Sequence, residues 1–247
     1  MTEVRTCRIA RAHNGPPGSA NGGYACGMFA RSAVDVVGTA VVVQLHAAPP
    51  LDTELAVHAH RGRALVWHED ELVATVSAVV HDQSAVAPFV TVAAAERAST
   101  FFAGAAAHPF PECLVCGTAR TDPAALHLTP GGVDGLPGVV ACIWAPTGDP
   151  DLDTVWAVLD CPGGWTLDQS GSPYVLGRMS ARVHAVPPSG EPAIVVAQHI
   201  ATVGRTARVV SALFGPDGTE FGRAEATWVR LSASSDPAPR KRERFRW

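Results

Sequence analysis

Two stretches of the chain resemble each other and decide the fold. Residues 62–78 read GRALVWHEDELVATVSA, and residues 207–228 read ARVVSALFGPDGTEFGRAEATW. Each consists of an apolar strand, a tight acidic turn and a second apolar strand, and Asp217-Gly218 is a favourable hairpin turn. A further strand is expected before each hairpin, at residues 54–60 and 193–201. The sequence therefore predicts an internal repeat.

Each half also contains one expected helix, at residues 22–34 and 152–159. Asn21 and Asp151 precede these helices, and both side chains can accept the free backbone N–H groups of a first turn. Strand-rich stretches follow the helices, at residues 38–46 and 175–186. The order predicts an α+β fold in which an antiparallel sheet wraps one long helix in each half. The alternative is a plain two-layer α+β domain whose similar halves are accidental.

The two halves set the expected domain organisation. An isolated half would expose a sheet edge and a helix face, so the halves are expected to pair edge to edge into one sheet. The Ala-, Pro- and Gly-containing stretch between them reads as a linker, of which residues 93–107 could form a helix. The expected parts are a first repeat (1–92), a linker (93–111), a second repeat (112–232) and a flexible basic tail (233–247).

Composition limits the classes of protein to consider. Of 247 residues, 47% are hydrophobic and 17% are charged, which is typical of a globular chain with a large core. The net charge of -4 argues against nucleic acid as a partner. No apolar run reaches the roughly 18–20 residues of a membrane helix, and the first residues lack the apolar core of a signal peptide. We therefore expect a cytoplasmic protein with reduced cysteines.

The sequence Asn21-Gly22-Gly23-Tyr24 begins the first expected helix. Two glycines allow a ligand to approach the backbone, and a helix start presents unpaired N–H groups and the positive end of the dipole. Such a site can hold a thioester carbonyl and stabilise an oxyanion. The structural alternative is that Gly22 and Gly23 only permit tight helix packing.

Asp160 follows the apolar run 155–159 and comes late in a mostly buried helix. A carboxylate in apolar surroundings is costly unless it is paired or used. Asp160 is therefore a candidate nucleophile or general base for water. The alternative is that it hydrogen-bonds the loop expected at residues 161–165 and only shapes it.

These motifs resemble those of hot-dog-fold acyl-CoA thioesterases, in particular the double-hot-dog TesB-like group and the PaaI-like group. In those proteins a Gly-Gly pair opens the central helix, and a catalytic acid follows about two turns later. Here the features are divided, because Ala30 stands where the first half would carry the acid, and residues 151–153 replace the glycines of the second half. The resemblance implies one working site, with Gly22 and Gly23 as oxyanion donors and Asp160 as base or nucleophile. The corresponding site with the two halves exchanged, which would join Ala30 to residues 151–153, is expected to be inactive.

The chain also departs from the pattern of the resembled groups. Asn21 stands where PaaI-like proteins have a histidine, and no convincing counterpart is found for the threonine that positions water in TesB-like enzymes. The nearest candidates for the water-positioning residues are Ser180 and Glu225. Asn21, Tyr24, Asn14, Ser180 and Glu225 are the expected substrate-binding residues, although a turn role is favoured for Asn14. These departures bear on hydrolysis more than on the fold.

Cys113 and Cys116 form a Cys-x-x-Cys-Gly motif in the stretch 113–117. A structural zinc site needs four ligands, no second paired motif follows, and the spacing of His108 and His127 fits no familiar pattern. The sequence favours a structured turn, and no metal site is expected. No cofactor is expected either, apart from coenzyme A as part of the substrate.

Three functions are compatible with this reading to different degrees. The first is hydrolysis of a small or medium acyl-CoA at a composite site between the repeats. The second is non-catalytic binding of acyl-CoA or lipid, which the missing threonine favours. A hydratase is disfavoured, because Gly164 and Trp165 stand where its histidine would follow Asp160. A further pairing into a homodimer is left open.

Overall fold

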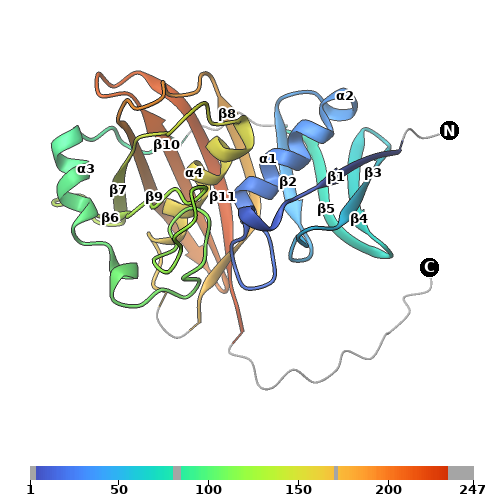
Figure 1. The fold of residues 1–247 in the computed structure, drawn as a ribbon, viewed down its shortest axis with the longest axis horizontal. Coiled ribbons are helices and arrows are strands. Elements are labelled where there is room, and N and C mark those ends of the chain that lie inside the picture. Colours follow the sequence, from blue (N-terminus) through green and yellow to red (C-terminus); the bar gives the residue numbers. More distant parts are fainter. Residues whose placement is uncertain (1–3, 80–84, 170–171, 233–247) are drawn as a thin grey trace.

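A computed structural model describes residues 4–79, 85–169 and 172–232, and the basic tail expected at 233–247 lies outside the described residues. The described strands form one sheet in the order β1-β3-β4-β5-β2-β8-β11-β10-β9-β7-β6. Figure 1 shows α1 and α4 in the middle of the molecule, with the strands of the first half on one side and those of the second half on the other. No helix among the described residues is long and apolar enough to cross a bilayer.

The first half consists of β1 and two helices followed by four strands. The alternating buried positions of the strands face the helix, as expected for a sheet with one face on the core. The elements are β1 (Val4–Arg8), a 3₁₀ turn (Arg11–His13), α1 (Gly22–Ser32), α2 (Val34–Val37), β2 (Val41–Leu45), β3 (Glu54–His60), β4 (Arg63–His68) and β5 (Glu71–Ala78).

The second half repeats this order with longer strands. The predicted hairpin at 207–228 is confirmed, because β10 and β11 pair antiparallel. The elements are β6 (Gly131–Gly132), β7 (Val139–Trp144), α4 (Leu152–Gly164), β8 (Tyr174–Val183), β9 (Ala193–Val203), β10 (Thr206–Phe214) and β11 (Glu220–Arg230).

The two halves join through an antiparallel pairing of β2 with β8, which confirms the expected edge-to-edge contact. Gln44 reinforces this junction, since its side-chain amide donates to the Gly177 carbonyl at 2.8 Å. That carbonyl lies where the register between β8 and β11 shifts. The shared sheet therefore places α1 and α4 against each other on one face.

Both predicted helix ends need correction. The helix expected to run through residue 34 ends at Ser32, and the short helix α2 follows it. The helix expected to end at Leu159 continues to Gly164 and includes Pro162. The extension is stabilised by burial of residues 160–164 and by the Ser211 hydroxyl, which donates to the Leu159 carbonyl at 2.5 Å. Tertiary packing overrides the local preference of Pro and Gly to end a helix.

The expected linker contains structure of its own. The helix α3 (Val92–Ser99) and a 3₁₀ turn (Ala103–Ala105) occupy part of it. Ala95 and Ala98 of α3 are buried in a second core cluster, separate from the main one, which also contains residues of β7, β9 and β10. This helix covers the face of the second half that α4 leaves open, and Figure 1 shows it at the outer edge of that half.

Candidate active site

The first turn of α1 lies against the second half of α4. The backbone N–H of Gly23 donates to Asp160 Oδ2 at 2.8 Å. A Cβ atom on Gly23 would lie 2.4 Å from Asp160 Cβ and 2.7 Å from the Trp156 carbonyl oxygen. Glycine is therefore required at position 23 for this close approach of the two helices, and the Gly23 amide is used to hold Asp160 rather than to bind a ligand.

The Asp160 carboxyl group is almost completely sealed from solvent, with 2% exposure. Its Oδ1 atom has no hydrogen-bond partner among the described residues. Burial raises the pKa of Asp160 to about 8, although the hydrogen bond from Gly23 opposes this shift. A buried carboxyl with a raised pKa, one anchored oxygen and one unpartnered oxygen is typical of a functional group rather than a structural one.

Asn21 caps α1 and connects it to the sulfur-containing part of the site. Its Oδ1 accepts the Tyr24 N–H at 3.0 Å, and its Nδ2 donates to Cys161 Sγ at 3.4 Å. The Gly22 N–H, in contrast, finds no acceptor among the described residues. The two glycine amides thus differ, since Gly23 holds Asp160 and Gly22 is available to a ligand.

A cavity of about 450 Å³ opens at this junction. Its wall is mainly apolar and contains few polar groups, which is typical of a site for an organic ligand. Asn21, Gly22 and Asp160 form its polar corner. The wall also includes Cys113, Cys116, Cys161, His108, Trp165, Tyr174, Leu176 and Trp228.

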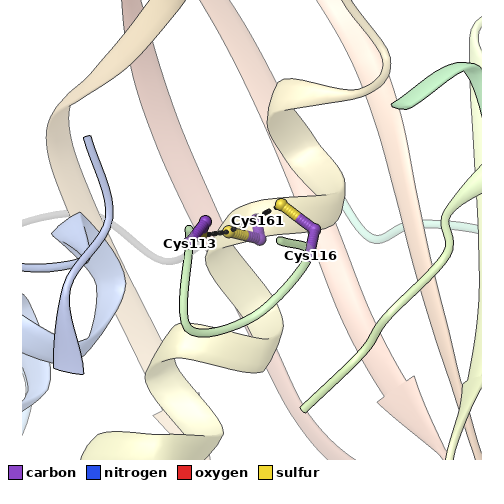
Figure 2. A group of neighbouring side chains, drawn as sticks. All are labelled: Cys113, Cys116 and Cys161. Carbon is purple, nitrogen blue, oxygen red and sulfur yellow. Dashed lines mark hydrogen bonds between the residues drawn. The ribbon is translucent and has the colours of Figure 1, made fainter. Parts of the chain in front are cut away.

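Three cysteine thiols meet beside Asp160. The Sγ atom of Cys161 lies 3.6 Å from that of Cys113 and 3.7 Å from that of Cys116. All three side chains are buried, and their sulfurs lie within 4.8 Å of one another (Figure 2). The turn expected at residues 113–117 is present, but the fold adds a third cysteine that lies on α4.

Two of the expected ligand-binding residues have other partners. The Tyr24 ring stacks on His13 with a centroid distance of 3.9 Å. Asn14 donates to the Glu112 carbonyl at 2.7 Å and accepts from Arg120 at 2.5 Å, so it joins the loop before α1 to the loop at residue 112. Neither residue lines the cavity beside Asp160.

Ser180 and Glu225 are neighbours, but they lie away from Asp160. They pair across β8 and β11, next to the pair formed by Met179 and Ala226. Met179 and Ala226 are buried in the main core, and successive residues of a strand point to opposite faces. The alternation therefore directs the Ser180 and Glu225 side chains away from the main core. Neither residue lines the cavity beside Asp160, and Ser180 is instead among the residues that line a second cavity.

The position that corresponds to the Gly23–Asp160 contact when the two halves are exchanged contains different side chains. A second cavity of about 390 Å³ is lined by Ala30, Leu152 and Asp153, among others. Asp153 is 1% exposed and pairs with Arg31, whose Nη2 lies 2.6 Å from Asp153 Oδ2. An ion pair thus occupies the place that corresponds to Gly23 and Asp160.

Sequence reasoning missed several residues of the cavity wall. Gln169 is one of them, but both ends of its amide are used, since it donates to the Gly164 carbonyl and accepts the Tyr174 N–H at 3.1 Å. Trp228 packs against Gly163 and Gly164. The glycines at the end of α4 were a signal of this close contact, whereas no pattern along the chain indicated Gln169 or His108.

These observations define a fold class rather than an individual protein. The chain has a hot-dog fold, in which a long helix packs on an antiparallel sheet. No protein-family model matches the chain, and no curated protein matches it. The comparison with solved structures shows the fold.

Three solved structures illustrate the similarity. The tesB protein of Mycobacterium avium subs paratuberculosis is 11% identical with a TM-score of 0.59, covering 94% of this chain and 96% of that one. A proposed thioesterase from Novosphingobium aromaticivorans is 14% identical with a TM-score of 0.61, covering 93% and 96%. A hot-dog protein of unknown function from Alicyclobacillus acidocaldarius is 9% identical with a TM-score of 0.61, covering 94% and 96%. At these identities the likeness shows the fold.

Proposed function

We propose that this protein is a double hot-dog acyl-CoA thioesterase that hydrolyses a small or medium acyl-CoA at one composite site between its two repeats. The observation that carries the proposal is the contact between Asp160 of α4 and the Gly23 amide of α1 at the wall of the 450 Å³ cavity. Structures of the same fold that are described as a tesB protein and as proposed thioesterases support the reaction class.

In this proposal Asp160 is the general base. The Gly23 N–H fixes Oδ2, and the unpartnered Oδ1 accepts a proton from the attacking water. The water oxygen bonds to the thioester carbonyl carbon, and the charge that develops on the carbonyl oxygen is stabilised by the Gly22 N–H at the positive end of α1. When the C–S bond breaks, Asp160 returns its proton to the leaving thiolate. The products are a carboxylic acid and free coenzyme A.

The apolar part of the cavity takes the acyl group. Trp165, Leu176 and Trp228 provide apolar surface in the same cavity as Asp160, and burial of an acyl chain there excludes bulk solvent while the attacking water stays at the base. The second cavity has no such role, because Arg31 neutralises its acidic residue Asp153. One site for each chain is therefore expected.

The test compares Asp160→Asn with Asp153→Asn, which changes a second buried acid two turns earlier on the same helix. Release of coenzyme A from several acyl-CoAs is measured by chromatography at pH 8. We expect the rate to fall at least about a hundredfold in D160N, as is typical after loss of a general base, and to persist in D153N. Equal turnover by wild type and D160N would refute the assignment of Asp160 as base.

The second candidate function is non-catalytic binding of an acyl-CoA or lipid. The raised pKa of Asp160 favours it, because a carboxyl with a pKa of about 8 is mostly neutral at pH 7 and suits an apolar ligand. A binding protein would retain its affinity, or gain affinity, in D160N. It would release no coenzyme A at pH 9, where Asp160 is ionised, whereas sustained release at that pH would exclude this candidate.

Three further features belong to the proposal rather than to the structure. The location is expected to be the cytoplasm, and no nucleic acid or membrane partner is expected. Pairing of two chains into a homodimer is left open. Sedimentation of the purified protein at several concentrations checks the last of these.

A further inference from the structure

The thiols of Cys113, Cys116 and Cys161 form a cluster that the proposed hydrolysis does not use. Cys113 and Cys116 belong to one turn, and Cys161 projects from α4 directly after Asp160 (Figure 2). The other described cysteines, Cys7, Cys26 and Cys142, take no part in it. Three convergent buried sulfurs are an unusual arrangement for thiols that serve only as apolar filling.

The spacing of the sulfurs fits one metal ion. Thiolates lie about 2.3 Å from Zn²⁺ in a tetrahedral site, which places any two of them about 3.8 Å apart. Cys161 Sγ lies 3.6 Å from Cys113 Sγ and 3.7 Å from Cys116 Sγ. An ion could therefore bind between the three sulfurs with small side-chain adjustments.

A side-chain amide also points at the cluster. Asn21 Nδ2 lies 3.7 Å from Cys113 Sγ and 3.4 Å from Cys161 Sγ. N–H donors directed at sulfur hold and orient the thiolates that bind a metal ion.

Gly117 completes the turn in a way that other residues would prevent. Its N–H donates to the Cys113 carbonyl at 2.9 Å. A Cβ atom there would lie 2.5 Å from that carbonyl oxygen and 2.6 Å from the Pro111 carbonyl oxygen. The motif Cys-x-x-Cys-Gly is thus built as a tight turn that presents both sulfurs to α4.

We propose that Cys113, Cys116 and Cys161 bind one thiophilic divalent metal ion of the Zn²⁺ type, with a fourth position open to the cavity. All three residues line that cavity, so solvent can reach the fourth position. Each cysteine loses its proton to solvent when the ion binds. The ion would fasten the turn at 113–117 to α4 beside the base, and it takes no part in the proposed hydrolysis.

His108 lines the same cavity but does not complete the site. Its Nδ1 accepts the Phe110 N–H at 2.9 Å, which leaves the proton of the neutral ring on Nε2. A protonated Nε2 has no lone pair for a metal. The sequence argument against zinc depended on the absence of further ligands near Cys116, and the fold supplies Cys161 from 45 positions away.

The experiment uses the full chain, reduced and freed of metal, and titrates it with Co²⁺ and then Zn²⁺. We expect one ion per chain, thiolate-to-cobalt charge-transfer absorption, visible bands typical of four-coordinate Co²⁺, and displacement by Zn²⁺. Cys161→Ala should weaken binding at least about tenfold, whereas Cys142→Ala, a buried cysteine outside the cluster, should not. His108→Ala should leave the cobalt spectrum unchanged.

A second measurement keeps the test decisive if C161A does not fold. Zn²⁺ should protect Cys113, Cys116 and Cys161 of the wild type from alkylation, as mapped by mass spectrometry, and should raise its melting temperature. No cobalt binding by the reduced chain, or protection of none of the three, would overturn the proposal. Formation of a disulfide within the cluster without any metal binding would overturn it as well. If His108→Ala changed the cobalt spectrum, His108 would be a ligand, and the proposal that the fourth position is open would be overturned.

Discussion

Asp160 accepts a hydrogen bond from the Gly23 N–H at 2.8 Å, although the two residues are 137 positions apart in the chain. One belongs to the helix of the second half and the other to the first turn of the helix of the first half. The site therefore exists only when both halves fold and pair.

The rate of the proposed hydrolysis should rise with pH up to about pH 8. A general base acts in its ionised form, and burial raises the pKa of Asp160 to about 8. Below that pH we expect kcat/KM to fall about tenfold for each pH unit. The measurement is a profile of kcat/KM from pH 6 to pH 10, corrected for spontaneous thioester hydrolysis. A profile that is flat down to pH 5 would contradict an ionisation near 8.

Asp160→Asn should stabilise the fold at neutral pH. Between about pH 4 and pH 8 the unfolded chain has lost the Asp160 proton while the folded chain retains it, so this group lowers the free energy of unfolding as the pH rises. Each pKa unit corresponds to about 1.4 kcal/mol, so the gain in D160N is at most about 4 kcal/mol at pH 7 and vanishes near pH 4. Urea unfolding at both pH values checks this. An equal gain in the free energy of unfolding at pH 7 and near pH 4 would contradict the explanation that burial of Asp160 destabilises the wild type.

Gly23→Ala should be more harmful than Gly22→Ala. The added methyl group of G23A meets the backbone of Trp156 and Ala157, which cannot move aside, whereas that of G22A meets the Leu176 side chain. Overpacking of this kind costs about 1–3 kcal/mol, and it displaces Asp160. Thermal unfolding and turnover are measured together.

Gly132→Ala is the matched control for the glycine variants, because nothing lies within 4 Å of its added Cβ. Its stability should stay within about 0.5 kcal/mol of the wild type. If G23A were as stable and as active as G132A, the close approach of α1 and α4 would not need a glycine.

Arg31→Ala should destabilise the fold without affecting the site at Asp160. The variant leaves the Asp153 carboxylate buried without its partner, so we expect the free energy of unfolding to fall by about 1–3 kcal/mol at pH 7. The lower part of this range applies because the Arg31 side chain is 59% exposed and solvent screens the ion pair. Burial raises the pKa of Asp153, and removal of Arg31 raises it further, so the loss should shrink toward pH 4.

A double variant tests the origin of the Arg31 effect. Adding Asp153→Asn to R31A removes the buried charge and should restore most of the stability, as measured by urea unfolding. Turnover should be preserved in R31A, in D153N and in the double variant. A loss of turnover equal to that of D160N would show that the second cavity participates in the reaction.

The repeat, its strands and the starts of both long helices could be predicted from the sequence because they depend on local signals. Two similar runs of apolar strand, tight turn and apolar strand identified the hairpins. Asn21 and Asp151 identified the helix starts, where each caps a backbone N–H. The ends of those helices were predicted less well. Burial of residues 160–164 keeps α4 helical through Pro162, and no local signal reports that burial.

The candidate site was predicted only in part. Gly22, Gly23 and Asp160 do meet, but the two amides have different partners. Ser180 and Glu225 were proposed from their alignment along strands, and they face away because strand direction and register decide the face to which a side chain points. Cys161 was not connected with Cys113 and Cys116, since a contact across 45 positions leaves no trace in spacing.

Short-range signals established which stretches form the repeated hairpins, where the helices begin and which half carries the acid, because these properties depend on neighbours along the chain. Folding in three dimensions was needed to establish that β2 pairs with β8, that α1 lies against α4 and that three cysteines converge beside Asp160. The physical reason is that burial, and with it the raised pKa of Asp160, arises from surfaces that meet only after the chain has folded.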